Sequence, residues 1–342
     1  MKRTLLLFAM AAIVAAGGRA ERAHAGDAAR LGTSGAQELR IPVGPRGTAL
    51  SGAATADASG VEALYWNPAG IARSSGTEAM FSTTSYLVDS RVHYLGLTQE
   101  MGKYGTIGVA VKAVALGDIE VTTEEVGGPT GETFSPSLTV IGVSAGRRLS
   151  DRVAFGVTAN LVTESVRNER AAGVAFDLGF QYEPGPRGFR FGAVMKSFGP
   201  KMRFTGSDFR FATDIPDADP SSTPRSVVTE SAAFDLPSSF QVGVTYDALD
   251  DENGRLRVLS AFQSNTFASD AFRFGAEYEW RGQLIARGGA TTAESDHDAW
   301  GVTYGGGVRA MLGETAVLID YTRQSTSAFF AEQNLVSLTL RF

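Results

Sequence analysis

The strongest constraint on this chain is an alternation of apolar and polar residues that runs from Thr77 to the C-terminus. The stretches are about nine to thirteen residues long and are separated by Gly, Pro, Asp or Asn, which favour turns. In the stretch 271–281 one parity carries Phe272, Phe274, Ala276, Tyr278 and Trp280, and the other carries Arg, Gly and Glu. Successive side chains of a strand point to opposite faces, whereas a helix would scatter both sets. The pattern therefore predicts β-strands.

The alternation predicts fourteen strands, at 77–88, 91–101, 104–115, 137–148, 153–165, 172–183, 188–199, 238–247, 255–264, 271–281, 283–291, 302–311, 314–324 and 334–342. They are about twice the usual length of strands in soluble proteins and match the ~9 to 11 residues that cross a bilayer at a tilt. An even number of strands, apolar and aromatic on one face and charged on the other, is typical of outer-membrane barrels with a polar interior. The sequence therefore predicts an all-β fold, a 14-stranded antiparallel transmembrane β-barrel over residues 77–342.

The connections between these strands give an independent test. If the chain enters from the periplasm, the odd-numbered connections lie outside, and they include the long ones at 117–136, 165–171, 200–237, 292–301 and 325–333. The even-numbered connections are short, at 102–103, 148–152, 184–187, 248–254, 282 and 312–313. Outer-membrane barrels have short periplasmic turns and longer external loops. The parity of the loops therefore supports the strand count.

Composition excludes several other classes of protein. With 43% hydrophobic residues the chain can bury a core, and after the N-terminus no apolar run approaches the ~20 residues of a spanning helix. A net charge of −6 without a basic patch argues against a nucleic-acid partner. The absence of cysteine excludes disulfides, Cys-ligated metals, thiol catalysis and a lipid-modified cysteine. No cofactor is expected.

Residues 1–25 have the pattern of a secretory signal peptide. Lys2 and Arg3 precede an apolar region of 12 residues, 5–16, and an A-x-A cleavage site at 23–25 lies before Gly26. The alternative is a membrane anchor, but an apolar region of this length is too short to span ~30 Å as a helix. We therefore expect an exported protein of the Gram-negative cell outer membrane.

Residues 26–76 do not alternate and are rich in Ala, Gly and Ser. The segment ends in the motif Tyr65-Trp66-Asn67-Pro68-Ala69-Gly70. Pro68 interrupts a helix and favours an extended or turn conformation at Asn67, while Gly70 permits a left-handed one. We interpret residues 26–76 as a small N-terminal hatch, or plug, of the barrel.

The hatch segment resembles FadL-like outer-membrane barrels and, more closely, their PorV/PorQ branch. The shared residues run from Gly44-Pro45-Arg46-Gly47 through Gly52-Ala53-Ala54 and Asp57-Ala58 to the Tyr65–Gly70 motif. At Ala49-Leu50-Ser51-Gly52 the chain departs from the Gly-Met-Gly-Gly-like turn that is common in the branch. The resemblance implies fourteen strands, a hatch in the lumen that carries the Asn-Pro-Ala motif, and passage of hydrophobic compounds.

Two functions follow from the resemblance, and neither is enzymatic. The first is passage of hydrophobic, fatty-acid-like small molecules across the outer membrane. The second is a membrane-held docking platform that receives secreted protein cargo in a type IX-like secretion system. Either function requires outer-membrane lipid and the barrel-assembly machinery. The alternating last strand ends in Phe342 and resembles the C-terminal signal by which such barrels are recognised for assembly.

Phenylalanines in the longest external loop are candidate ligand or partner contacts at the mouth: Phe204, Phe209, Phe211 and Phe234, with Ile215 beside them. A loop folded on itself is the alternative. Charged residues on the polar strand faces, at Arg190, Lys196, Arg273, Glu277, Glu279 and Arg281, define either a polar conduit or cross-strand pairs, and we favour pairs.

Catalytic and metal sites are weakly indicated. His297 lies in the acidic segment 294–298, and the second histidine of the mature chain is His93; we interpret the segment as a solvated loop because its spacing fixes no partner for a catalytic base. Asp214, Asp217 and Asp219 carry oxygen ligands suited to Ca²⁺, but the prolines between them favour solvated carboxylates. The acidic cluster at 247–254 ends in Asn253-Gly254, which predicts a charged hairpin turn.

Overall fold

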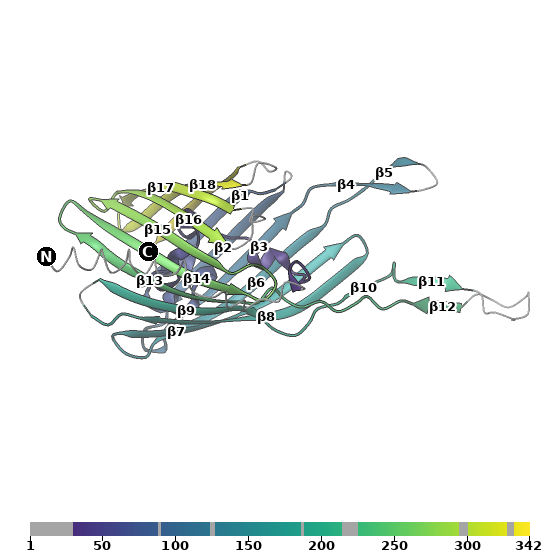
Figure 1. Ribbon diagram of the computed structural model, residues 1–342, viewed down its shortest axis with the longest axis horizontal. Helices are drawn as coiled ribbons and strands as arrows, with labels where there is room; N and C mark the ends of the chain where they lie inside the picture. The colour runs from purple at the N-terminus through teal and green to yellow at the C-terminus, as the bar shows by residue number, and fades with distance from the viewer. Residues whose placement is uncertain are drawn as a thin grey trace, which may run out of the picture.

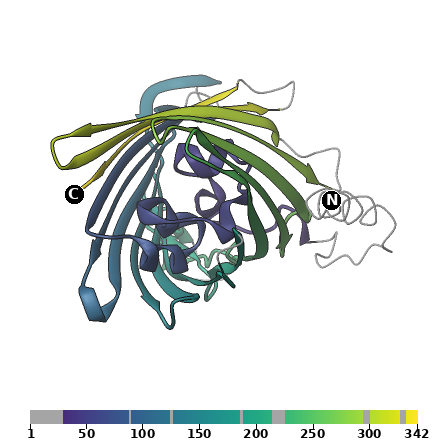
Figure 2. The same ribbon diagram turned by 90° about the vertical axis from the view of Figure 1, so that its left-hand side faces the viewer.

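The computed structural model describes residues 30–87, 90–123, 127–185, 188–213, 225–293, 300–326 and 332–342. Fourteen of its strands form a closed antiparallel barrel in which each strand pairs with the next one of the barrel and β19 pairs with β1 (Figures 1 and 2). The barrel strands are β1 (Thr77–Ser85), β2 (Arg91–Glu100), β3 (Thr106–Ala115), β6 (Ser137–Arg148), β7 (Val153–Val166), β8 (Glu169–Tyr182), β9 (Phe189–Phe198), β13 (Ser239–Asp250), β14 (Gly254–Asn265), β15 (Ala271–Trp280), β16 (Leu284–Ala293), β17 (Trp300–Leu312), β18 (Thr315–Thr326) and β19 (Gln333–Arg341). The predicted fold is confirmed.

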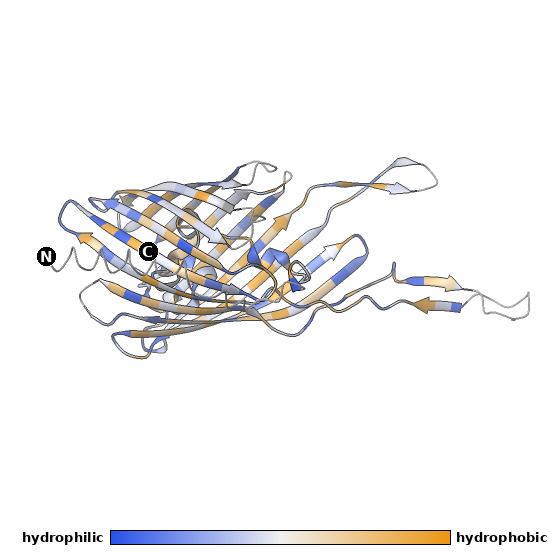
Figure 3. Cartoon of the chain, viewed as in Figure 1, coloured by the Kyte–Doolittle hydropathy of each residue, from blue (hydrophilic) through white to orange (hydrophobic). Residues whose placement is uncertain are grey.

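The two faces of the wall follow the alternation. On β15, Phe272, Tyr278 and Trp280 are exposed on the outside, whereas Glu277 is 3% exposed in the lumen. Figure 3 shows hydrophobic and hydrophilic residues alternating along the barrel strands. Exposed apolar side chains occur on strands around the whole barrel, as a lipid-facing surface requires. None of the helices in the described ranges is long and apolar enough to cross a membrane.

Two connections at the long-loop end form additional strands that the sequence prediction treats as loops. One hairpin consists of β4 (Ile119–Thr123) and β5 (Gly128–Phe134). The other connection contains β10 (Phe204–Gly206), which pairs with β8, and a hairpin of β11 (Arg210–Thr213) and β12 (Arg225–Val228). Figure 1 shows both hairpins projecting well beyond the barrel. These strands are short and exposed on both faces, so burial leaves no alternation in their sequences.

The hatch, residues 30–76, lies inside the ring of strands (Figure 2). It consists of short helices: η3 (Gln37–Arg40), α2 (Pro45–Ala49), η4 (Ala53–Ala56), η5 (Gly60–Glu62), α3 (Ala63–Trp66) and η6 (Pro68–Arg73). Gly44, Gly52 and Gly60 adopt φ values of 79°, 77° and 64°, which side chains with a Cβ rarely adopt. These left-handed residues separate one helix from the next, so the hatch folds as a chain of tight turns that fits a narrow lumen.

Glycines on the inward faces of the strands allow the hatch to approach the wall. We call the following set the glycine belt: Gly96, Gly108, Gly146, Gly156, Gly179, Gly192, Gly243, Gly275 and Gly289. At each of these positions an added Cβ would crowd an atom of the hatch. Gly156 on β7, for example, faces the carbonyl of Pro68, and Gly179 on β8 faces the side chain of Asn67. Part of the high glycine content of the chain, 40 residues, is thus explained by the close packing of the hatch against the wall.

The belt gives a testable pair of variants on β16. A Cβ at Gly289 would lie 2.6 Å from the carbonyl carbon of Leu50 in the hatch, whereas at the adjacent Gly288 the nearest atom would be 3.8 Å away. We expect Gly289→Ala to destabilise the docked hatch by about 1–3 kcal/mol, the usual cost of overpacking, and Gly288→Ala to leave it unchanged. Hydrogen exchange of hatch peptides measures the difference. Equal exchange in the two variants would show that the close approach of the hatch to the wall does not depend on the glycine belt.

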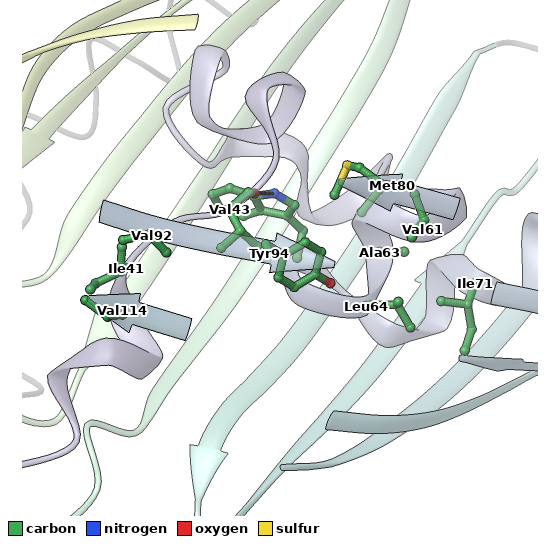
Figure 4. Close-up of a cluster of buried hydrophobic side chains, with 12 residues drawn as sticks. Ile41, Val43, Val61, Ala63, Leu64, Ile71, Met80, Val92, Tyr94 and Val114 are labelled. Atoms are coloured by element: carbon green, nitrogen blue, oxygen red, sulfur yellow. Dashed lines mark hydrogen bonds between the residues drawn. The ribbon is translucent and has the colours of Figure 1, made fainter. Parts of the chain in front are cut away.

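Between the hatch and strands β1 to β3 the contact is apolar (Figure 4). Val61, Leu64 and Ile71 of the hatch belong to one cluster of buried side chains with residues of these strands, which are Met80, Val92, Tyr94 and Val114. On the opposite side of the barrel the contacts are ionic, as described below. The hatch is therefore held by burial on one side and by charge on the other.

Candidate functional site

The Asn-Pro-Ala motif joins the hatch to the barrel wall. Asn67 is fully buried, and its amide nitrogen donates to the carbonyl of Thr55 at 2.7 Å and to that of Phe180 on β8 at 3.2 Å. Its side-chain oxygen accepts the backbone N–H of Ala69 at 3.1 Å and so caps η6, which begins at Pro68. Asn67 therefore forms hydrogen bonds with backbone groups of the hatch and of the barrel wall.

The remaining motif residues fix the middle of the hatch. The indole N–H of Trp66 donates to the carbonyl of Val43 at 3.0 Å, and its ring meets that of Tyr65 edge-on at 5.0 Å. Ala69 is fully buried, and a Cβ at Gly70 would overlap the carbonyl of Ala58. Five of the six predicted motif residues are thus buried and Tyr65 is partly buried, and the motif forms one joint between the hatch and the wall.

Two lysines approach the ring of Tyr65. Lys196 Nζ lies 3.5 Å from the ring centroid and Lys112 Nζ lies 4.7 Å from it, both within cation–π range. Lys112 Nζ also donates to the carbonyl of Ile41 at 3.1 Å. Burial raises the pKa of the Tyr65 phenol above its ordinary value, so the ring stays neutral.

A β-bulge on β9 places Lys196 and Ser197 together at this point. The register of β8 with β9 passes from Phe176↔Phe198 to Leu178↔Met195, so two residues of β9 lie opposite Asp177. Ser197 adopts a φ of 58°, and its N–H donates to Asp177 Oδ1 at 2.6 Å. The sequence prediction did not find this bulge, because both residues fit within an ordinary alternating strand.

Above the hatch, at the long-loop end, lies a chamber of about 1450 Å³ that we call the vestibule. One side is mostly apolar and is formed by the hatch and the connections and strands β1 to β6, with Leu39, Ile41, Leu87, Val114, Leu116 and Leu138. The other side is formed by strands β13 to β18 and is polar, with Ser239, Gln241, Gln263, Asn265, Thr291 and Gln324. Tyr65 and Trp66 also line the vestibule. The vestibule thus has one mostly apolar wall and one mostly polar wall, and Glu38, Arg40, Lys196 and Arg273 add charged groups to its lining.

Below the hatch, at the short-turn end, a chamber of about 330 Å³ has a charged lining. Arg46 of α2 lines this turn-end chamber, whereas Thr48 of the same helix lines the vestibule. Helix α2 is therefore part of the partition between the two chambers.

An arginine–carboxylate network ties the hatch to strands β9 to β18. Its members are Arg46 and Asp57 of the hatch with Arg190, Asp247, Arg257, Glu277, Arg287 and Asp320 of the wall. Glu277 accepts from Arg46 at 2.9 Å and from Arg257 at 2.7 Å. Burial alone would raise the pKa of Asp57, but Arg46, Arg257 and Arg190 hold it below its ordinary value. The network therefore stays charged at neutral pH.

The favoured pairing of lumen charges is observed for Arg190, Glu277 and Glu279, the last with Arg309. The three other predicted members have different contacts: Lys196 lies over the ring of Tyr65, Arg273 donates to the carbonyl of Ser51, and Arg281 lies over the ring of Trp280. The acidic cluster needs a correction, because Asp247 is a lumenal partner of Arg190 and Arg257 and not part of the turn. Strand β13 extends to Asp250, so the turn begins later than predicted.

Glu62 gives the hatch a pH dependence. Its carboxylate accepts a hydrogen bond from the backbone N–H of Arg46 at 3.1 Å. Burial raises its pKa from 4.5 to about 7, so the neutral form is favoured in the docked hatch. The charge of Asp320 on the wall also raises the pKa of Glu62, and the charge of Arg287 lowers it. Because the folded-state value is the higher one, docking is most favourable below pH 4.5 and weakens as the pH rises through about 7.

We expect exchange of hatch amides, corrected for intrinsic rates, to accelerate between pH 5 and pH 8 in the wild type and to do so less in Glu62→Gln. An identical pH dependence in both proteins would contradict the role of Glu62.

The mouth phenylalanines do not form one patch. Phe204 and Phe234 contact each other, with ring centroids 5.7 Å apart, and join a buried cluster with Ala36, Leu39 and Met202. Phe211 lies on the β11–β12 hairpin and is 52% exposed, and Phe209 directly precedes that hairpin. None of the four is among the residues that line the vestibule in the described part of the chain. Phe204 and Phe234 therefore hold the start of the hatch, and only Phe211 offers an open apolar surface.

The other candidates are also placed. His93 lies on the outward face of β2, where its ring stacks with Phe81 at 6.4 Å. His297 with its acidic segment, Asp214, Ile215, Asp217 and Asp219, and the signal-peptide segment 1–25 lie outside the described residues. Within the described ranges no group of three or more His, Cys, Asp or Glu could hold a metal ion.

The main chain of Phe342 pairs with Thr77, at N···O distances of 2.9 and 3.3 Å, and completes the seam of the barrel.

Comparison with known proteins identifies the fold. No family model and no curated protein sequence matches the chain. Solved structures do: the CymD monoaromatic hydrocarbon channel (13% identity, TM-score 0.56), the Ralstonia pickettii toluene transporter TbuX (13%, 0.55) and a Pseudomonas aeruginosa FadL homologue (12%, 0.53). Each alignment covers 88% of this chain and 98 or 99% of the other. The chain therefore has the same barrel fold as these solved channels and this FadL homologue.

Proposed function

We propose that this protein is an outer-membrane channel for hydrophobic small molecules. The observation that carries the proposal is the vestibule, which offers a large apolar wall at the long-loop end of a barrel whose lumen contains a hatch. The likeness in fold to the toluene transporter TbuX and the CymD monoaromatic hydrocarbon channel supports the same class of solute. A molecule that leaves water for the apolar wall gains roughly 25 cal/mol per Å² of buried apolar surface.

The charged turn-end chamber favours a channel that stays closed to bulk flow. Arg46 and Asp57 bind the hatch to several strands, so removal of the whole hatch would break many buried ion pairs together. Passage therefore requires a local rearrangement of the hatch or an opening of the wall, rather than expulsion of the hatch.

Uptake of labelled toluene by a Gram-negative host that lacks its own hydrophobic channel tests the proposal. Expression of the protein should raise toluene uptake and leave uptake of a small sugar unchanged. Val114→Gln, which places an amide on the apolar wall of the vestibule, should lower toluene uptake several-fold at an equal yield of folded barrel. Toluene uptake no higher than in the empty host would overturn the proposal.

The PorV/PorQ assignment is a proposal that rests on the hatch motif, and secretion docking is the second candidate function. The observation that favours docking is the projecting β11–β12 hairpin, on which Phe211, Val227 and Val228 are exposed (Figure 1). Deletion of residues 207–230 separates the candidates. If the protein is a docking platform, the deletion should abolish co-purification of a cargo protein and leave toluene uptake unchanged. If the protein is a channel only, no cargo protein is lost on deletion, and toluene uptake is the readout of its function.

Export and assembly are part of the proposal. A mature chain that begins at Gly26 in the outer-membrane fraction is the expected product, and intact-mass analysis reads its N-terminus. We propose that the barrel-assembly machinery recognises the side chain of Phe342. This residue is 62% exposed, although its backbone pairs with Thr77 at the seam. Phe342→Asp should lower the yield of heat-modifiable barrel without lowering synthesis.

A further inference from the structure

The polar wall of the vestibule contains an amide whose oxygen has no hydrogen-bond partner among the described residues. Gln241 donates to the carbonyl of Gly52 at 2.7 Å, and Gln263 donates to Asn265, which in turn donates to the carbonyl of Ser269. Gln324 is different: it is only 6% exposed, and its side-chain oxygen has no hydrogen-bond partner in the described part of the chain. A buried amide oxygen without a partner costs roughly 1–3 kcal/mol.

Gln324 lies at the floor of the vestibule, beside the hatch. In the register of β17 with β18 it pairs with Thr303, whose hydroxyl contacts the hydroxyl of Ser51 at 2.7 Å and donates to the carbonyl of Ala49. The rings of Tyr65 and Trp66 line the same chamber, and the opposite wall is mostly apolar. An unsatisfied polar group therefore faces a space whose far side would bury hydrocarbon.

We propose that the vestibule takes an amphipathic molecule that carries a hydroxyl, with the O–H donating to Gln324 and the apolar body against Leu39, Ile41 and Val114. This inference rests on the proposed channel function and narrows its substrate class. A plain hydrocarbon leaves Gln324 without a partner, and a carboxylate, which only accepts hydrogen bonds, pairs with the amide in only one of its two orientations. A hydroxyl both donates and accepts, and so it pairs with the amide in either of its two orientations.

Three probes with the same eight-carbon chain test the proposal: octane, 1-octanol and octanoate. Trp66 reports binding in a protein in which the other two tryptophans are replaced, W280F and W300F, held in lipid nanodiscs. Partition of each probe into the lipid is the same for every variant. It therefore cancels when the ratio of the octane and 1-octanol dissociation constants is compared between variants.

We expect 1-octanol to bind more tightly than octane in this parent protein, and Gln324→Leu to reduce that preference about tenfold, which corresponds to ~1.4 kcal/mol. The matched control is Gln333→Leu. Gln333 is the register partner of Gln324 on β19; it is buried and its amide also has no hydrogen-bond partner in the described chain, but it is not among the residues that line the vestibule. The control should keep the preference, provided that both variants give the heat-modifiable barrel of the parent protein.

The outcomes separate the inference from the proposed function. If octane and 1-octanol bind and Gln324→Leu keeps the full preference, or if Gln333→Leu loses it equally, the role of Gln324 is wrong while the channel stands. If octanoate binds best and Gln324→Leu does not change it, the ligand is anionic and the inference is overturned. If none of the three probes changes the emission of Trp66, the proposed function fails together with the inference.

Discussion

Replacing Asn67 with alanine is expected to release the hatch from the wall while the barrel stays closed. The substitution removes the side-chain donor to the carbonyls of Thr55 and Phe180 and the acceptor of the Ala69 N–H, and it leaves the Thr55 carbonyl with only the longer bond from Gln181 at 3.3 Å. At roughly 0.5–1.5 kcal/mol for each of the three hydrogen bonds lost, the docked hatch should lose about 1.5–4.5 kcal/mol. The strand ladder is untouched because Asn67 contributes nothing to it, so hydrogen exchange should accelerate in hatch peptides and not in strand peptides.

Asn334→Ala is the matched control, since that amide lies on the outside of β19 and accepts only from the Tyr321 hydroxyl at 2.6 Å. It should leave hatch exchange unchanged. Pro68→Ala should give a smaller effect in the same direction as Asn67→Ala, because it loosens the start of η6 without removing a hydrogen bond. If Asn67→Ala exchanges like the wild type, the motif is not the anchor of the hatch.

The second large effect is expected at Glu277, the centre of the ionic contacts. Its carboxylate pairs with Arg46, Arg257 and Arg287 and is 3% exposed. Glu277→Gln removes the negative charge that these three buried guanidinium groups share. Breaking a buried ion pair in this way costs about 3–5 kcal/mol. The hatch should then detach from the β14 to β16 wall, and ion conductance in a planar bilayer should rise above that of the wild type.

Glu279→Gln provides the control for this variant. Glu279 lies on the same strand and pairs with Arg309, which is 37% exposed, so its loss should cost no more than about 1 kcal/mol. Its conductance should equal that of the wild type. A Glu277→Gln barrel that conducts no more than the Glu279→Gln barrel would show that the network does not hold the lumen closed.

The strands were predictable because their signal is local. Each lipid-facing strand repeats every two residues, as in 271–281, so the sequence predicts the barrel, its strand count and the parity of its loops. In the stretch 271–281 the polar parity includes Gly275, and glycine at inward positions on successive strands is a signal for a close neighbour in the lumen.

The site was less predictable because its contacts join distant parts of the chain. Arg46 and Glu277 are 231 residues apart, and nothing near either of them indicates the pair. The Ser197 bulge fits within an alternating strand, and the β11–β12 hairpin is too short and too exposed to show a pattern. The hatch motif was visible in advance because Asn67 and Pro68 carry distinct backbone and hydrogen-bonding properties of their own, and the lumen charges were visible as a set but not their partners in the hatch.

The central claim is that a hydrophobic small molecule occupies the vestibule above the hatch. Anomalous diffraction from crystals grown with bromobenzene tests it most directly, because bromine marks the position of the ligand. The account predicts a bromine peak in the vestibule between Trp66 and the apolar wall of Ile41, Val114 and Leu138, lost in Val114→Gln. Bromine peaks only on the lipid-facing surface, with an empty vestibule, would contradict it.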